Sequence, residues 1–277
     1  KRYSRIPVVR YDGRNFNLKK DRKNKRFMTN ALIYLAVFLA IQVGVTSGVQ
    51  LLWRLASGSG DMTAMMLIVA SGAFSIVTMV VFLLARWAVV SRNYVRSGPW
   101  DVLFWCAVAA LGAIVPSLWI QERMPELPNL LDVHMDMVLR ERWGYVAVGL
   151  LAPLVEELVF RGAILRALFR QWKSRPWLCI TVSAAIFAVV HGNPAQMPHA
   201  FVIGILLGWM YVRTGSIVPG VVYHWVNNTI AYVLYNIFPI PDAQLIMYFG
   251  TETRVVLALL CSFCMLIPAL FQLNRRM

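Results

Sequence analysis

The sequence predicts an all-α protein, a polytopic transmembrane helical bundle of about eight spans. Three observations support this class. The mean hydropathy is +0.61, and 59% of the 277 residues are hydrophobic, which excludes an ordinary soluble domain. Several apolar runs reach the roughly 20 residues that a helix needs to cross a bilayer. These runs are continuously apolar and lack the two-residue alternation of a transmembrane β-barrel strand.

The chain begins with a basic tail at residues 1–26. This tail holds eleven of the 27 Lys and Arg residues against two Asp, so its net charge is +9 out of +14 for the whole chain. The positive-inside rule and the attraction of anionic lipid headgroups both favour the cytoplasmic side for such a tail. No aromatic stacking surface accompanies the charge, which argues against nucleic acid as a partner.

Residues 27–143 are predicted to hold three spans, at 27–53, 62–85 and 102–120, and one surface helix. The first span contains no charged residue, and a basic loop with Arg86, Arg92 and Arg96 follows the second. Within residues 130–143 the sequence LLDVHMDMVLRERW mixes apolar and charged residues. This mixture favours an amphipathic helix lying at the membrane surface.

Residues 144–238 are predicted to hold spans four to seven, at 144–169, 177–191, 198–212 and 216–238. The sequence GNPAQMP at 192–198 separates spans five and six, because it combines glycine with two prolines. Residues 239–277 form a loop and the last span, 255–273. With the amino terminus in the cytoplasm, the basic segments 86–96, 166–175, 213 and 275–276 all fall on the cytoplasmic side, so both termini are predicted there.

Two adjacent carboxylates lie inside the fourth predicted span. Of the thirteen Asp and Glu residues, only Glu156 and Glu157 fall within an apolar run. An ionised carboxylate at bilayer depth costs about 2.5–3.5 kcal/mol even on lenient scales, so the pair indicates a functional site. Glu157 can pair with Arg161, four residues further on, which leaves Glu156 about 100° around the helix and free to act.

Spans five and seven add further polar groups at helical spacing. His191 lies where span five breaks, and His224 and Asn228 lie four residues apart on span seven. Together with Glu156 they could build a hydrolytic site around a water molecule. A buried Glu can act as a general base. Imidazole and amide N–H groups can stabilise the oxyanion of a tetrahedral intermediate. His134, His199 and Asn227 are predicted to be structural.

Three sequence motifs resemble those of the CPBP intramembrane proteases, the family of type II CAAX prenyl endopeptidases and bacterial Abi proteins. EELVFR at 156–161, FAVVH at 187–191 and HWVNN at 224–228 match the family patterns EExxxR, FxxxH and HxxxN in order. The resemblance covers about residues 144–238. It implies that Glu156 is the catalytic glutamate and that His191 helps to activate water. His224 and Asn228 would form the oxyanion hole, and Glu157 and Arg161 would support the site.

The resemblance implies an intramembrane endopeptidase that acts on membrane-associated or lipid-modified peptides or proteins. It also favours a bacterial cytoplasmic membrane as the location and a reaction without a cofactor. At ~1.5 Å per residue, the four catalytic groups lie near the middle of the bilayer, towards its cytoplasmic half. We therefore expect a polar cavity between spans four, five and seven that admits water from the cytoplasm.

Three alternatives remain open on the sequence. A divalent metal such as zinc could be held by Glu156, His191 and His224, since two His and a carboxylate form a known catalytic set. The chain could be a non-proteolytic scaffold or regulator of a partner protein. It could also be a transporter in which Glu156 and the histidines relay protons, although inverted repeats typical of transporters are not visible.

Overall fold

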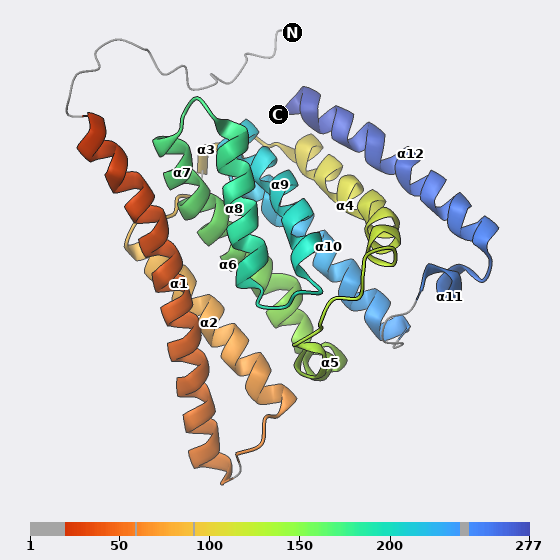
Figure 1. The fold of residues 1–277 in the computed structure, drawn as a ribbon, viewed down its shortest axis with the longest axis horizontal. Coiled ribbons are helices and arrows are strands. Elements are labelled where there is room, and N and C mark those ends of the chain that lie inside the picture. The colour runs from red at the N-terminus through yellow and green to blue at the C-terminus, as the bar shows by residue number, and fades with distance from the viewer. Residues whose placement is uncertain (1–19, 59, 91, 239–243) are drawn as a thin grey trace.

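The computed structural model describes residues 20–58, 60–90, 92–238 and 244–277, and all regular secondary structure in these ranges is helical (Figure 1). The prediction of an all-α protein is therefore confirmed. The basic tail predicted at 1–26 lies outside the described residues, apart from the backbone from Lys20, where the first helix begins. The loop after residue 238 is described only from residue 244.

Each predicted span corresponds to a helix. The predicted surface helix is also present, as α5 (Asp132–Arg140), which Figure 1 shows end-on while the long helices run in the plane of the view. The other helices outside the fourth predicted span are α1 (Lys20–Ser57), α2 (Ala64–Leu84), α3 (Arg92–Arg96), α4 (Trp100–Gln121), α8 (Pro176–Val190), α9 (Met197–Thr214), α10 (Val218–Ile237), α11 (Leu245–Phe249) and α12 (Glu252–Arg276).

Among the residues that the structure describes, four helices are long and apolar enough to cross a membrane. They are residues 28–57 of α1, and α2, α4 and α12. The helix α8 is apolar but has only 15 residues, about 22 Å at 1.5 Å per residue, which is less than the ~30 Å of a hydrocarbon core. A membrane-spanning bundle is thus confirmed, while the count of eight spans stays a prediction.

The fourth predicted span is a single helix with two wide turns. It comprises η1 (Val146–Leu151), α6 (Ala152–Glu156), η2 (Glu157–Leu165) and α7 (Arg166–Gln171), and η1 and η2 are π-helical. We call residues 144–171 the composite helix. Every residue of η2 is buried, so the centre of this helix is also the centre of the main core. Wide turns of this kind are rare and frequently lie at functional sites.

The composite helix, α8, α9 and α10 lie between two outer helix pairs, α1 with α2 and α4 with α12 (Figure 1). Large apolar side chains on the outer helices are exposed, among them Leu52, Leu84, Phe104 and Leu260. Such a surface suits lipid rather than water, because soluble monomers rarely expose contiguous apolar patches of this kind. The arrangement therefore encloses the more polar helices within apolar ones.

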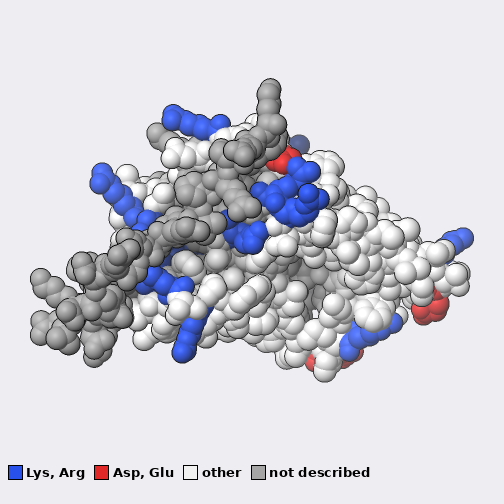
Figure 2. All heavy atoms as spheres, turned by 90° about the horizontal axis from the view of Figure 1, so that it is seen from above, with Lys and Arg blue, Asp and Glu red and all other residues white. Residues whose placement is uncertain are grey.

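Basic side chains gather at one end of the bundle. Figure 2 looks onto the end where α1 begins and α12 finishes, and shows Lys and Arg spread across it. Helices that finish with basic residues contribute Arg170, Arg213, Arg275 and Arg276. This distribution is the one expected for a cytoplasmic face, and the orientation in the membrane stays a prediction.

Candidate active site

The predicted ion pair between Glu157 and Arg161 is present. Arg161 Nη1 donates to Glu157 Oε1 at 2.8 Å, and the two side chains are 0% and 1% exposed. Arg161 Nη2 also donates to the Gly204 carbonyl of α9 at 3.2 Å. The guanidinium lies 4.4 Å from the centroid of the Phe187 ring. Because both charges are buried, each is stabilised mainly by the opposite charge of its partner. The Gly204 carbonyl and the face of the Phe187 ring stabilise the cation further.

The second oxygen of Glu157 lies against the backbone of α10. A Cβ built on Gly220 would be only 2.6 Å from Glu157 Oε2, closer than any real contact. Glu157 Oε2 has no hydrogen-bond partner among the described residues. The absence of a side chain at Gly220 therefore leaves room for this close approach. The predicted site did not include Gly220.

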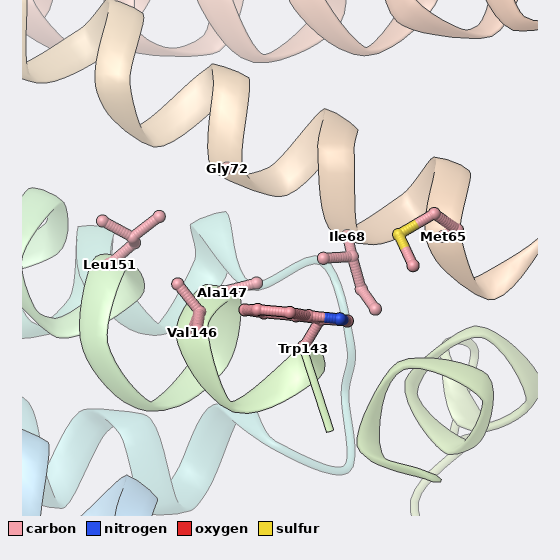
Figure 3. A pocket seen from close by; sticks show the side chains of 7 residues that line it. All are labelled: Met65, Ile68, Gly72, Trp143, Val146, Ala147 and Leu151. Atoms are coloured by element: carbon pink, nitrogen blue, oxygen red, sulfur yellow. The ribbon is translucent and has the colours of Figure 1, made fainter. Parts of the chain in front are cut away.

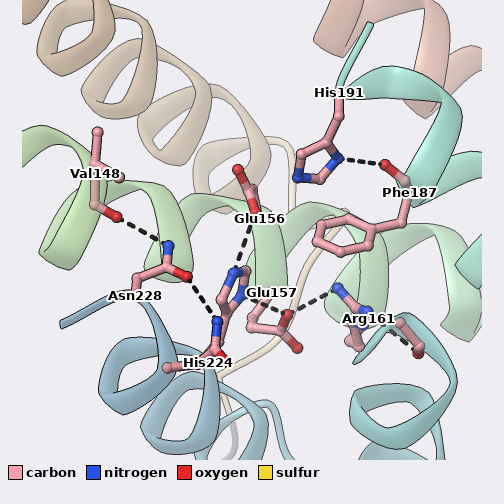
Figure 4. A network of polar contacts seen from close by, with 10 residues as sticks. Val148, Glu156, Glu157, Arg161, Phe187, His191, His224 and Asn228 are labelled. Carbon is pink, nitrogen blue, oxygen red and sulfur yellow. Dashed lines mark hydrogen bonds and ion pairs between the residues drawn. The ribbon is translucent and has the colours of Figure 1, made fainter. Parts of the chain in front are cut away.

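His224 lies between the two glutamates (Figure 4). Its Nδ1 is 3.3 Å from Glu157 Oε1, and its Nε2 is 3.7 Å from Glu156 Oε2. The Glu156 side chain is 22% exposed and contacts no guanidinium among the described ion pairs. Glu156 is therefore the accessible carboxylate, and Glu157 is the buried one.

His191 stands directly after α8, at the break that the sequence predicted. Its Nδ1 lies 2.8 Å from the Phe187 carbonyl oxygen. A carbonyl can only accept, so Nδ1 carries the hydrogen and the neutral ring keeps a lone pair on Nε2. The Phe187 ring separates the two imidazoles, with centroids 4.7 Å from His191 and 6.0 Å from His224. The phenylalanine of the FxxxH motif thus contacts both histidines and Arg161.

Asn228 is held from both ends. Its Nδ2 donates to the Val148 carbonyl at 3.0 Å, and its Oδ1 accepts from Asn227 Nδ2 at 3.3 Å. One N–H of the Asn228 amide is therefore already used, and the second remains for a ligand. Asn227, predicted to be structural, acts here by orienting its neighbour.

A further buried amide fixes the chain just beyond His191. Asn193 is 0% exposed; its Oδ1 accepts from the Leu130 amide at 3.0 Å and its Nδ2 donates to Asn129 Oδ1 at 2.8 Å. These bonds join the turn after α8 to the segment before α5. The glycine and prolines of this turn predicted only a helix break, and the predicted site did not include Asn193.

The proposed metal ligands do not form a ligand set in this arrangement. Within the described ranges, no three His, Cys, Asp or Glu side chains lie close enough together to hold a metal ion. Glu156 and His224 approach one another, but His191 directs Nδ1 to the Phe187 carbonyl. In the alternative with a zinc ion, the side chains of Glu156, His191 and His224 would have to move to form the ligand set.

An apolar cavity of about 240 Å³ lies beside the amino-terminal part of the composite helix. Figure 3 shows its walls, which are Met65, Ile68 and Gly72 of α2 and Trp143, Val146, Ala147 and Leu151. A second cavity, of about 220 Å³, lies near the loop between α1 and α2. The polar cavity predicted between spans four, five and seven stays a prediction.

Comparison with known proteins agrees with the motifs. Residues 139–230 match the family model described as type II CAAX prenyl endopeptidase Rce1-like. The "Membrane-embedded CAAX protease MroQ" of Staphylococcus aureus (strain USA300) is 32% identical over 85 residues, which are 29% of this chain and 34% of that protein. The chain thus matches about a third of this relative's length. No solved structure matches this chain. Both matches fall on the segment that carries the three motifs, and they support its resemblance to the CPBP family.

Proposed function

We propose that the chain is an intramembrane endopeptidase that uses Glu156 to activate a water molecule. The observation that carries the proposal is the division between the two glutamates. Glu157 is fully buried against Arg161, whereas Glu156 is partly exposed beside His224. A partly exposed carboxylate among apolar helices, with an imidazole next to it, is suited to general base catalysis.

In the proposed reaction, Glu156 removes a proton from water while the water oxygen attacks the peptide carbonyl carbon. The lone pair on His191 Nε2 orients the same water by accepting its second hydrogen. When the tetrahedral intermediate collapses, the C–N bond breaks and Glu156 returns the proton to the leaving amine. Glu156 thus acts first as a general base and then as a general acid, as one side chain can in general acid–base catalysis.

His224 Nε2 and the unused N–H of Asn228 are the proposed donors to the oxyanion. His224 Nδ1 faces the Glu157 carboxylate and donates its hydrogen there. Nε2 can therefore donate to the oxyanion only in the doubly protonated ring, in which both nitrogens carry a hydrogen. Each such donor typically contributes about 10²–10³ in kcat.

The proposed substrates are membrane-associated or lipid-modified peptides or proteins. The family match and the relative named as a CAAX protease support this class. We propose that the reaction needs no metal and that Glu156 and His191 activate the water. Anionic headgroups at the basic tail and the cytoplasmic location of both termini are likewise proposals.

The test compares membrane proteins from bacteria that express the full chain as wild type, as Glu156→Gln or as Glu126→Gln. Glu126 is an exposed loop residue and serves as the matched control. New protein termini should appear with the wild type and Glu126→Gln and be absent with Glu156→Gln. They should persist when purified wild type is assayed with EDTA. The same termini with Glu156→Gln would refute the mechanism and favour a non-proteolytic role.

A further inference from the structure

The composite helix widens immediately before a proline. In η1 the amide of Ala152 donates to the carbonyl of Ala147, five residues back rather than four. The next residue, Pro153, has no N–H, and in a regular α-helix its ring would collide with the carbonyl of Gly149. Widening the turn is a known way for a helix to accommodate such a conflict.

The wide turn leaves one carbonyl without a backbone donor, and Asn228 supplies the missing hydrogen bond. Ala152, which would serve Val148 in an α-helix, donates to Ala147 instead. The residue five positions after Val148 is Pro153, which cannot donate. Asn228 Nδ2 donates to the Val148 carbonyl at 3.0 Å. Such a bond has particular value inside a bilayer, where no bulk water can replace it.

The extra residue in η1 also decides which glutamate faces α10. Tyr145 contacts α10 before the wide turn, since its hydroxyl lies 3.1 Å from both Thr229 Oγ1 and Trp225 Nε1. Glu157 contacts α10 after it, at His224 and Gly220.

In an uninterrupted α-helix, residues 145 and 157 would point about 120° apart, whereas 145 and 156 would be only about 20° apart. One inserted residue shifts the register by about 100°, which brings residue 157 to the α10 side.

We propose that Pro153 is a positioning residue of the active site. By maintaining the wide turn it presents the Val148 carbonyl to Asn228 and sets the register that buries Glu157 against α10 and leaves Glu156 accessible. The role of Glu156 in this inference rests on the proposed function. The register and the hydrogen bond do not, so they can be tested without a substrate.

The first test is a double-mutant cycle on the thermal midpoint of the purified full chain. In the wild type, Asn228→Ala removes the donor to Val148 and should lower the midpoint. In a Pro153→Ala background, backbone amides can serve that carbonyl, so the same substitution should lower the midpoint by half as much or less. Pro268→Ala is the matched control, because it also replaces a proline inside a membrane-spanning helix. In the Pro268→Ala background, Asn228→Ala should lower the midpoint as much as it does in the wild type.

Equal decreases in the wild-type and Pro153→Ala backgrounds, or no decrease in the wild type, would overturn the proposal. A purely structural role for Pro153 would lower every midpoint without changing the effect of Asn228→Ala.

The second test replaces the wide turn by a deletion. Removing Leu150, an exposed residue of η1, from Pro153→Ala should give a regular helix in which Tyr145 and Glu157 again share a face. This variant should recover at least half of the thermal midpoint that Pro153→Ala loses, and should regain Glu156-dependent cleavage. If Pro153→Ala alone does not fold, folding of the deletion variant supports the proposal. Failure of both variants to fold, or full activity of Pro153→Ala, refutes it.

Discussion

The contact between Glu157 and α10 can be tested by a single added methyl group. In Gly220→Ala the new Cβ would lie 2.6 Å from Glu157 Oε2 and 3.4 Å from its Cδ. The carboxylate cannot simply move aside, because its other oxygen lies 2.8 Å from Arg161 Nη1 and 3.3 Å from His224 Nδ1. We therefore expect the clash to displace His224, which is 3.7 Å from Glu156.

The magnitude follows from comparison with Gly48→Ala. Gly48 lies in α1 with nothing within 4 Å of its would-be Cβ. Both substitutions gain the ~1 kcal/mol by which alanine exceeds glycine in helix propensity, but only Gly220→Ala adds an overpacking cost of about 1–3 kcal/mol. Since ~1 kcal/mol shifts the midpoint of a chain of this size by about 2–4 °C, Gly220→Ala should melt roughly 2–12 °C below Gly48→Ala.

Thermal unfolding of both purified variants is the first assay, and Glu156-dependent cleavage is the second. Gly220→Ala should also cleave at least ~10-fold more slowly than Gly48→Ala, because His224, the proposed oxyanion donor, would move and lose most of its ~10²–10³ contribution. Identical midpoints and identical cleavage rates for the two variants would show that the Glu157 carboxylate does not contact α10 at Gly220.

Three further predictions concern neighbouring residues. Arg161→Ala should destabilise the fold by about 3–5 kcal/mol, because it leaves the Glu157 charge buried and unpaired; an unchanged melting curve would exclude the pair. Glu156→Gln and His191→Ala should abolish cleavage while keeping the thermal midpoint, since both side chains are only partly buried; residual turnover near the wild-type rate would contradict their roles. After replacement of the native cysteines, Val190→Cys should react with a membrane-impermeant thiol reagent from the cytoplasmic side, and labelling only from outside would reverse the orientation.

The helices and the ion pair were predictable because their causes are local. Each predicted apolar run forms a helix. The four-residue spacing of Glu157 and Arg161 places their side chains close enough to form an ion pair. The break after His191 followed from glycine and proline in the next residues. These features depend on neighbours in sequence, which is why one sequence suffices to find them.

The contacts across helices were not predictable in the same way. The sequence placed His224 in an oxyanion hole but gave no sign that it bridges both glutamates, because that depends on how α10 approaches the composite helix. The Val148 carbonyl belongs to the backbone, so the identity of residue 148 does not indicate that it accepts a hydrogen bond from Asn228. Pro153 did offer a signal, a proline inside a predicted span, which indicates a local irregularity without specifying its geometry.

The geometry gives a physical reason for two adjacent glutamates followed by an arginine. Two ionised carboxylates on neighbouring residues repel each other, and burial strengthens the repulsion because the effective dielectric constant falls. Arg161 compensates the charge of Glu157 at 2.8 Å, which reduces this repulsion. Glu157 in turn holds His224 Nδ1 and thereby directs Nε2 towards Glu156. In the proposed mechanism, the second glutamate and the arginine thus set the orientation of the imidazole that lies beside the first glutamate.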